Sequence, residues 1–251
     1  MTLTRYTIKV EYVGKNYAGS QIQGGQGKIA PATIQPELEK ALSTLINKEK
    51  IKTIFSGRTD KGVNSKGQIV HFETEKTLVA SKFIHSMNEI LPADISISDL
   101  KEVTTEVHAQ KSAKKRSYKY VFYNKKQRSA FDGELLLIKW DLDVQRMQKS
   151  LEYLLGEHDF RSFESSGSTT QNKICFIYNV ECKKLDDTIV INIVGNRFLY
   201  NMVRAIVGTL LLIEKNNLEP ETMKTVLEAQ DRSKAGKTVS PYGLTLMKVE
   251  Y

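Results

Sequence analysis

Two kinds of apolar spacing alternate along this chain, and their order in the first half recurs in the second half. In residues 6–12, apolar or aromatic side chains occupy every second position, which is the period of a β-strand with one buried face. In residues 33–46 they recur at helical spacing and form one apolar stripe. Because strand and helix patterns alternate in this way, we predict an α+β fold built from two similar mixed halves.

The same spacing rules predict the bounds of the individual elements. In the first half we predict strands over residues 6–12, 51–55, 68–72 and 95–103, and helices over residues 33–46 and 77–91. In the second half we predict strands over residues 117–124, 135–140 and 244–251, two more strands joined at Asp186 and Asp187, and helices over residues 144–155, 199–213 and 221–230. The glycine- and glutamine-rich residues 13–30 are predicted to form a surface loop.

The two halves are expected to divide near residues 104–114, as residues 1–106 and 107–251. Each half is predicted to contain an antiparallel sheet with helices packed on one of its faces. Two sheets side by side leave a cleft between them, and binding sites often lie in such clefts. We therefore expect the active cleft between the two halves.

The composition argues against several classes of protein. Apolar residues make up 40% of the chain and charged residues 26%, so a disordered chain is not expected. The longest nearly apolar run, residues 205–213, is much shorter than the ~20 residues of a membrane span. The first residues show no secretory signal, and Cys175 and Cys182 are the only cysteines. We interpret both as ordinary apolar residues of a reduced, cytoplasmic protein.

Basic residues are concentrated in one segment. The 37 Lys and Arg residues exceed the 29 Asp and Glu residues by 8, which favours a polyanionic partner such as nucleic acid. Residues 111–128 contain eight basic residues and no acidic residue, and aromatic residues are interleaved with them. The candidates for RNA binding in this segment are Lys114, Lys115, Arg116, Lys119 and Lys125.

The aromatic residues of this segment allow two interpretations. As a strand, residues 117–124 place Tyr118, Tyr120 and Phe122 on one face. Cations bind a phosphate backbone and aromatic rings stack on unstacked bases, so the face could bind RNA. The alternative is a solvated strand whose aromatic side chains lie partly in the core.

Signatures of cofactor and metal sites are missing from the sequence. It contains no Gly-x-Gly-x-x-Gly dinucleotide fingerprint and no nucleophile-elbow pattern. His71, His85, His108 and His158 are far apart and share no spacing typical of zinc ligands. We expect neither a cofactor nor a metal.

The segment from Phe55 to Ser65 carries candidate chemistry. An apolar strand ends there, two glycines bracket a tight loop, and Arg58 and Asp60 project from it. One interpretation is a simple β-turn, because Asp and Gly are common turn residues. The other is a reactive Asp60 carboxylate, presented at a strand end and held ionised by a nearby guanidinium.

A helix predicted in the second half contains a single charged residue in an apolar stretch. Arg204 is the only charge in residues 203–213, and a helix that is apolar almost all round is mostly buried. A buried guanidinium needs an anion, since leaving it unpaired costs several kcal/mol. Its partner could be any nearby acid, or the side chain could reach water from the start of the helix.

Residues 57–63, Gly-Arg-Thr-Asp-Lys-Gly-Val, resemble the catalytic motif of the TruA family of tRNA pseudouridine synthases. Six further segments resemble motifs of that family in the same order: residues 12–21, 33–42, 108–120, 156–160, 195–210 and 235–246. The resemblance implies an isomerase that detaches the uracil of a tRNA uridine, turns it and reattaches it through carbon. It implies targets at uridines 38, 39 and 40 of the anticodon stem-loop, no cofactor, and a homodimer with two α+β halves around an active cleft.

The resemblance also implies roles for single residues. Asp60 matches the catalytic aspartate, and Arg58 matches the residue thought to assist base extrusion. Tyr118 matches the pocket tyrosine that contacts the base, and Leu244 matches an apolar wall of the pocket. Arg204 matches the arginine that pairs with the catalytic carboxylate. Whether the carboxylate attacks the ribose, attacks the uracil or removes a ribose proton stays open.

Four positions depart from the family pattern. Ser20 stands where Trp is usual, Asn64 where His is common, Gln110 where Arg is common, and Lys119 where Arg is found. These departures bear on how the protein holds RNA and which uridine it prefers.

Two other functions remain as alternatives: a non-catalytic RNA-binding protein, and a pseudouridine synthase that acts on another RNA. A protein that only binds RNA has no need for a carboxylate facing the anion, so the pair Arg58 and Asp60 favours the enzyme.

Overall fold

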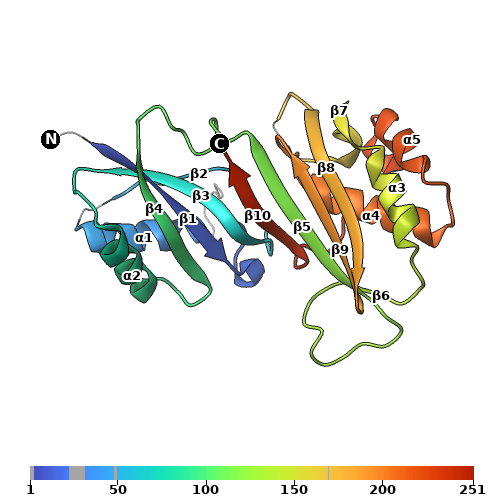
Figure 1. Cartoon of the computed structure of the whole chain (residues 1–251), viewed down its shortest axis with the longest axis horizontal. Helices are drawn as coiled ribbons and strands as arrows, with labels where there is room; N and C mark the ends of the chain where they lie inside the picture. Colours follow the sequence, from blue (N-terminus) through green and yellow to red (C-terminus); the bar gives the residue numbers. More distant parts are fainter. Residues whose placement is uncertain (1–2, 23–31, 48–49, 169) are drawn as a thin grey trace. The chain divides into compact units, whose positions relative to one another are not determined.

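The computed structural model describes residues 3–22, 32–47, 50–168 and 170–251 (Figure 1). The chain forms two compact units, one of Met1–Lys114 with Leu246–Tyr251 and one of Lys115–Thr245. The expected halves were residues 1–106 and 107–251. The second unit instead begins at Lys115 and ends at Thr245. The last residues group with the first unit because the final strand pairs with a strand of that unit. Within the described residues, every helix is too short or too polar to span a membrane.

The first unit is an antiparallel sheet with two α-helices. Its elements are β1 (Thr4–Tyr12), the 3-10 helix η1 (Gly14–Asn16), α1 (Ile34–Ile46), β2 (Ile54–Phe55), β3 (Asn64–Thr74), α2 (Ala80–Ile90) and β4 (Ile95–Val103). The sheet has the order β4-β1-β3, and the short strand β2 also pairs with β3. Strand β10 (Leu244–Glu250) lies next to β3.

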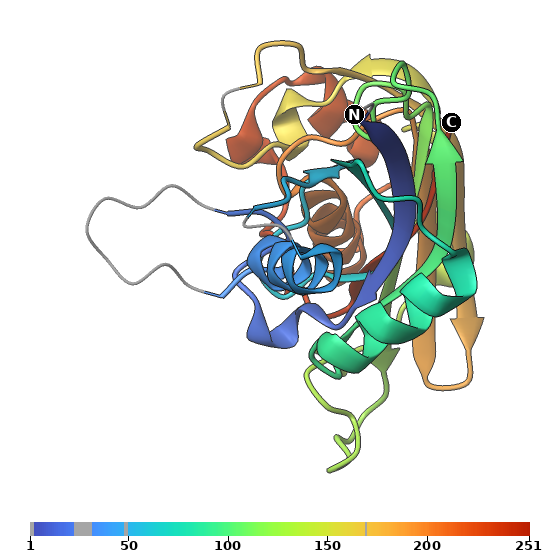
Figure 2. The same cartoon turned by 90° about the vertical axis from the view of Figure 1, so that its left-hand side faces the viewer.

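Alternation along the strands explains the core of the first unit. In β1 the residues Tyr6, Ile8, Val10 and Tyr12 are buried, and Tyr6 lies opposite Phe72 of β3. The apolar stripe of α1 and two residues of α2 pack against this face. Figure 2 shows both helices on the same face of the sheet. The predicted α+β fold is confirmed, and in this unit the helices cover one face as expected.

The second unit repeats the combination of a sheet and helices. Its elements are β5 (Lys115–Asn124), β6 (Leu137–Ile138), α3 (Val144–Glu152), β7 (Gly156–Asp159), η2 (Arg161–Phe163), β8 (Ile174–Leu185), β9 (Thr188–Gly195), α4 (Met202–Lys215), α5 (Thr222–Glu228) and η3 (Arg232–Lys234). The sheet has the order β5-β9-β8-β7 and is antiparallel, except that β6 pairs with β5 in parallel. The turn at Asp186, with φ 50°, joins β8 and β9 as predicted.

The two cysteines occupy one strand. Cys175 and Cys182 both lie on β8, and both are free and buried. Burial raises the pKa of Cys175 to about 11 and that of Cys182 to about 12. Both thiols therefore stay protonated near neutral pH and pack as small apolar side chains.

Several predicted bounds were wrong, and side-chain hydrogen bonds explain the clearest case. Only Ile54–Phe55 of the predicted strand 51–55 is a strand. The backbone N–H of Ile51 donates to Ser43 Oγ and that of Thr53 donates to Glu39 Oε1, at 3.2 and 2.9 Å. Both acceptors belong to α1, so this segment is held by a helix and not by a strand partner.

Four other segments were also predicted wrongly in part. The strand over 135–140 is limited to β6, and α3 ends at Glu152, because Gly156, at φ 95°, already starts β7. Helix α4 starts at Met202, three residues later than predicted. The loop over 13–30 begins with η1 and buries Tyr17 and Ser20, while residues 23–30 lie outside the described residues.

Candidate active site

Asp60 lies in the connection between β2 and β3 of the first unit. Gly19 and Asp60 form an isolated β-bridge, and the N–H of Val63 donates to the carbonyl of Asp60 at 3.1 Å. Asp60 is half-buried, whereas Arg58 is exposed. The segment is thus a tight turn, as the simpler interpretation predicts, and it also presents a carboxylate that is partly removed from water.

Two glycines allow the chain to pack this tightly. Gly62 has φ 80°, a conformation that residues with a Cβ rarely adopt. A Cβ at Gly14 would lie 2.1 Å from the carbonyl oxygen of Val63, which is an impossible approach. The loop therefore depends on η1, which follows directly after β1.

Arg58 is held by a neighbouring amide. Its Nε donates to Oε1 of Gln21 at 2.6 Å. This hydrogen bond orients the Arg58 side chain. Gln21 follows the Gly19 bridge, so the same short segment contacts both Arg58 and the backbone of Asp60.

Buried hydroxyl groups hold Thr59, the residue before Asp60. The Tyr12 hydroxyl and Thr59 Oγ1 form a hydrogen bond of 2.8 Å. The N–H of Thr59 donates to Ser20 Oγ at 2.9 Å, and the N–H of Ser20 donates to the carbonyl of Thr59 at 3.1 Å. Burial raises the pKa of Tyr12 above its ordinary value, while the hydrogen bond with Thr59 acts in the opposite direction. Sequence reasoning did not identify Tyr12 and Thr59 as part of the site.

Two of the departures from the family pattern turn out to support this loop. Ser20 is fully buried and accepts the hydrogen bond from Thr59. Asn64 Oδ1 accepts a hydrogen bond of 2.9 Å from the N–H of Gly14. Gln110, in contrast, is exposed. Ser20 thus holds the loop directly through Thr59, and Asn64 holds Gly14 of η1, against which the loop packs.

Arg204 lies in the first turn of α4, in the second unit. Eleven residues of this helix are buried, which confirms the prediction of a mostly buried helix. The Nε of Arg204 donates to the carbonyl of Val239 at 2.8 Å, and its Nη1 donates to Asn201 Oδ1 at 2.5 Å. These two neutral oxygens fix the direction of the guanidinium. Asn201 itself has φ 60° and donates to Ser165 Oγ.

Tyr118 and Leu244, the two predicted pocket residues, also belong to the second unit. The half-buried ring of Tyr118 packs edge-on against Phe198, with 5.1 Å between the ring centroids. Leu244 is 5% exposed at the start of β10. Phe198 is a contact that sequence reasoning missed, although residues 195–210 were singled out as a motif.

The aromatic face of β5 is largely core. Tyr120 and Phe122 have no exposed surface, so these two rings are not available to stack on bases. The alternative of a strand with partly buried aromatics is therefore correct for them. Tyr118 remains half-exposed on the same face.

The predicted RNA-binding side chains have different surroundings. Lys115 Nζ lies 4.7 Å from the centroid of the Tyr178 ring, and Arg116 donates to the carbonyl of Asn196 at 2.6 Å. Lys125 forms an ion pair of 2.5 Å with Asp132, an acid outside the basic segment. Lys114 is exposed and Lys119 is half-buried.

Two histidines that are distant in the sequence lie together. The rings of His71 and His108 are 5.1 Å apart, which corrects the expectation that all four histidines are separate. The Nδ1 of His71 accepts a hydrogen bond from the N–H of Ala109. Among the described residues, no three His, Cys, Asp or Glu side chains are grouped as metal ligands.

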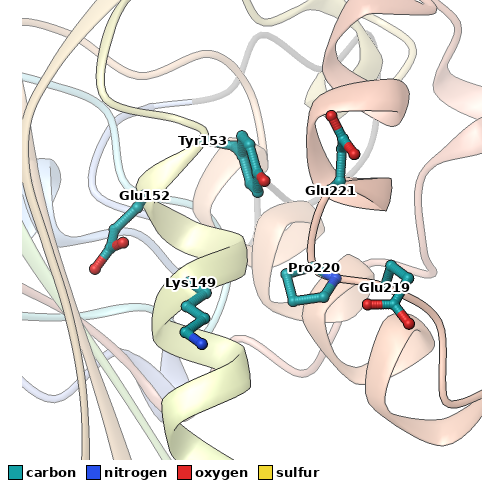
Figure 3. Close-up of a pocket in the computed structure, with 6 residues that line it drawn as sticks. All are labelled: Lys149, Glu152, Tyr153, Glu219, Pro220 and Glu221. Atoms are coloured by element: carbon teal, nitrogen blue, oxygen red, sulfur yellow. The ribbon is translucent and has the colours of Figure 1, made fainter.

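The second unit has a surface pocket that is separate from the predicted site residues. It is open to solvent between α3 and the start of α5 (Figure 3), and it is lined by Lys149, Glu152, Tyr153, Glu219, Pro220 and Glu221. It contains none of the predicted site residues.

Comparisons with known proteins cover nearly all of the chain. A family model described as "tRNA pseudouridine synthase" matches residues 151–251. Another, described as "Uncharacterized protein conserved in bacteria (DUF2344)", matches residues 48–191. A chain in the solved structure of a Cbf5-Nop10-Gar1 complex aligns at 9% identity with TM-score 0.43, over 96% of this chain and 57% of that chain.

Curated relatives match over nearly their full length. The protein named tRNA pseudouridine synthase A from Caldicellulosiruptor saccharolyticus is 41% identical over 97% of this chain and 98% of its own length. Proteins of the same name from Colwellia psychrerythraea and Bacillus subtilis are 38% and 36% identical, each over 98% of this chain and over 93% and 99% of their own lengths. Identity at this level across almost all of both chains shows common family membership. The chain belongs to the tRNA pseudouridine synthase A family.

Proposed function

We propose that this protein converts uridine to pseudouridine in tRNA, at positions 38, 39 and 40 of the anticodon stem-loop. The observation that carries the proposal is the half-buried Asp60 on its hydrogen-bonded turn, within a chain that matches a synthase of this name over 97% of its length. The enzyme is an isomerase, because substrate and product contain the same atoms.

The reaction needs a carboxylate, and it needs the target uracil held outside the stacked bases of the RNA. The bond between the ribose and N1 of uracil breaks, the detached base turns, and a carbon of the ring bonds to the ribose in its place. Asp60 is the group we assign to this chemistry, as a nucleophile toward ribose or uracil or as a base that removes a ribose proton. Since the base is reused within the pocket, no cofactor or metal is required.

The remaining site residues take supporting roles in the proposal. Arg58 assists base extrusion, since its exposed side chain is held at one point by Gln21 and projects from the turn. Tyr118 contacts the extruded base, with Phe198 fixing its ring, and Leu244 forms an apolar wall. Arg204 pairs with Asp60 and keeps the carboxylate ionised.

The proposed partners are the anticodon arm of tRNA and a second copy of this chain. Lys114, Lys115, Arg116 and Lys119 are the residues we assign to the phosphate backbone. Lys125 contributes less, because Asp132 neutralises it. We place the reaction in the cytoplasm, which fits the two free cysteines.

The decisive experiment is base-resolved mapping of pseudouridine in tRNA treated with the pure protein. Mass measurement of the whole tRNA does not suffice, because the reaction leaves the mass unchanged. We expect new pseudouridine at positions 38, 39 and 40, and none in transcripts with cytidine at those positions. Binding of tRNA without any product would support the non-catalytic alternative, and product at other positions or in another RNA would support a different target.

A further inference from the structure

A set of buried polar side chains lies in and next to the loop that carries Asp60. They come from β1, from the segment around Gly19, from the loop itself and from β3. None is more than 6% exposed: Tyr12, Ser20, Ser56, Thr59, Ser65 and Gln68. We call this set the polar cluster.

Hydrogen bonds of the polar cluster reach the loop on both sides of Arg58. Gln68 Nε2 donates to the carbonyl of Gly57 at 2.8 Å, and Gln68 Oε1 accepts from Ser56 Oγ. On the other side, Thr59 is held through its side chain by Tyr12 and through its backbone by Ser20. The two anchored residues, Gly57 and Thr59, flank Arg58, and Thr59 directly precedes Asp60.

The position of Gln68 shows that stability alone does not explain the polar cluster. Gln68 lies opposite Val10 and continues the buried row of β3 that includes Val70 and Phe72. Burying a polar group costs free energy unless every hydrogen bond is made, whereas an apolar side chain of similar shape is often neutral or stabilising there. A satisfied network in such a place fixes one geometry, which is what a reactive group requires.

We infer that the polar cluster positions the Asp60 loop for catalysis, and that the hydrogen bond between Tyr12 and Thr59 is its central link. The inference rests on the proposed function of Asp60. Tyr12 and Thr59 are positioning residues, because their buried side chains act through the backbone next to Asp60. An error of about 1 Å in the position of a reacting group costs on the order of a hundredfold in rate, so a partial loosening should have a measurable effect.

The first test compares two tyrosines of β1. Tyr12→Phe removes the hydroxyl next to Thr59, and we expect kcat to fall about tenfold with KM for tRNA within twofold of wild type. Tyr6→Phe is the matched control, since Tyr6 is also 3% exposed on the same face and its hydroxyl contacts the N–H of Leu78, away from the loop. Its kcat should stay within twofold of wild type. Equal effects of the two variants on kcat would overturn the inference.

The second test uses Thr59. Thr59→Val removes the hydroxyl at nearly constant volume, and Thr59→Ser keeps it. We expect Thr59→Val to match the loss of Tyr12→Phe, Thr59→Ser to restore most of kcat, and the double variant Tyr12→Phe/Thr59→Val to lose no more than either single variant. Additive losses would show that the two hydroxyls act separately and would contradict the inference.

Amide hydrogen exchange supplies a readout that does not depend on activity. Because the N–H of Thr59 is bonded to Ser20, Tyr12→Phe should speed exchange in residues 57–63 at least severalfold, while Tyr6→Phe should not. Unchanged exchange in Tyr12→Phe would refute the positioning role. If the two variants differ in exchange as expected but the wild-type protein forms no pseudouridine, the proposed function is refuted. The structural link between Tyr12 and the loop is then left intact.

Discussion

The Nζ of Lys125 lies 2.5 Å from Oδ1 of Asp132, and their side chains are only 18% and 11% exposed. The second carboxylate oxygen of Asp132 accepts a hydrogen bond from the N–H of Ser129, so the pair closes the loop that follows β5. The hydrogen bond to Asp132 raises the pKa of Lys125, and the same bond lowers the pKa of Asp132. Both charges therefore persist together at neutral pH, and they cancel each other locally.

This pairing leads to a prediction about the salt dependence of tRNA binding. Replacing Lys114, Lys115 and Lys119 with Gln should weaken binding and flatten the plot of log Kd against log salt concentration. Each lost phosphate contact lowers the slope by about 1, so the triple variant should lose up to about 3. Lys125→Gln is the matched control and should lower the slope by much less than 1. Fluorescence anisotropy over a range of KCl concentrations measures both.

The outcome that contradicts this assignment is specific. If Lys125→Gln lowers the slope by a full unit while the triple variant leaves it unchanged, RNA contacts the loop after β5. The residues at the start of β5 would then have no part in binding.

A second prediction concerns Asp60. Asp60→Asn keeps the size and most of the hydrogen-bonding capacity of the side chain but supplies neither a good nucleophile nor a base. We expect pseudouridine formation to fall below about a hundredth of wild type, with the Kd for tRNA changed by a few-fold at most. Base-resolved mapping in a time course and a binding titration measure the two quantities.

Asp99→Asn serves as the control for this substitution. Asp99 has φ 54°, a conformation that Asn tolerates, and it is largely exposed on β4. It should retain wild-type turnover. Turnover by Asp60→Asn above a hundredth of wild type would reduce Asp60 to a structural turn residue.

The spacing of apolar residues predicted the sheet and helices of the first unit well where one face is buried. In β1 and α1 the buried positions are those of the predicted pattern, because a period of 2 or 3.6 is a direct consequence of one-sided burial. The segment from Ile51 to Phe55 failed because its backbone bonds to Glu39 and Ser43, and no local pattern records such a partner.

In the candidate site, too, the features that are local in sequence could be predicted and the contacts between distant residues could not. Asp60 could be proposed from the sequence because its motif is local. The hydrogen bond between Tyr12 and Thr59 joins residues 47 positions apart, so only the tertiary fold brings them together. One signal was present, since Tyr12 and Gln68 are polar residues at inward positions of alternating strands and a buried polar group needs a partner.

A third prediction concerns pH and His71. Burial, with a smaller contribution from the charge of Arg5, lowers the pKa of His71 from 6.5 to about 4. Between these values the unfolded chain binds a proton that folded His71 does not, so the free energy of unfolding should fall as pH decreases from about 6.5 to about 4. The loss is on the order of 2–3 kcal/mol, and it should be absent above pH 7.

The measurement is the difference in urea unfolding between wild type and His71→Gln at pH 7.5 and pH 5. His71→Gln cannot gain a proton in this range, so its stability relative to wild type should improve on acidification. His85→Gln, at an exposed position of α2, should show no such change. If His71→Gln and His85→Gln behave alike, protonation of His71 does not limit stability.

The last prediction concerns Arg204, whose guanidinium is oriented by Val239 and Asn201. In our proposal its charge keeps Asp60 ionised in a site with little water. Without a neighbouring positive charge a carboxylate becomes protonated at higher pH, so Arg204→Gln should lower kcat and move the acidic limb of the pH–rate profile upward by about one unit or more. Arg146→Gln is the control, because Arg146 forms an ion pair with the buried Glu214 of the same unit and its loss should reduce stability without moving the limb. Circular dichroism and melting curves establish that both variants are folded. A folded Arg204→Gln with low activity and an unmoved acidic limb would show that Arg204 does not set the ionisation of Asp60.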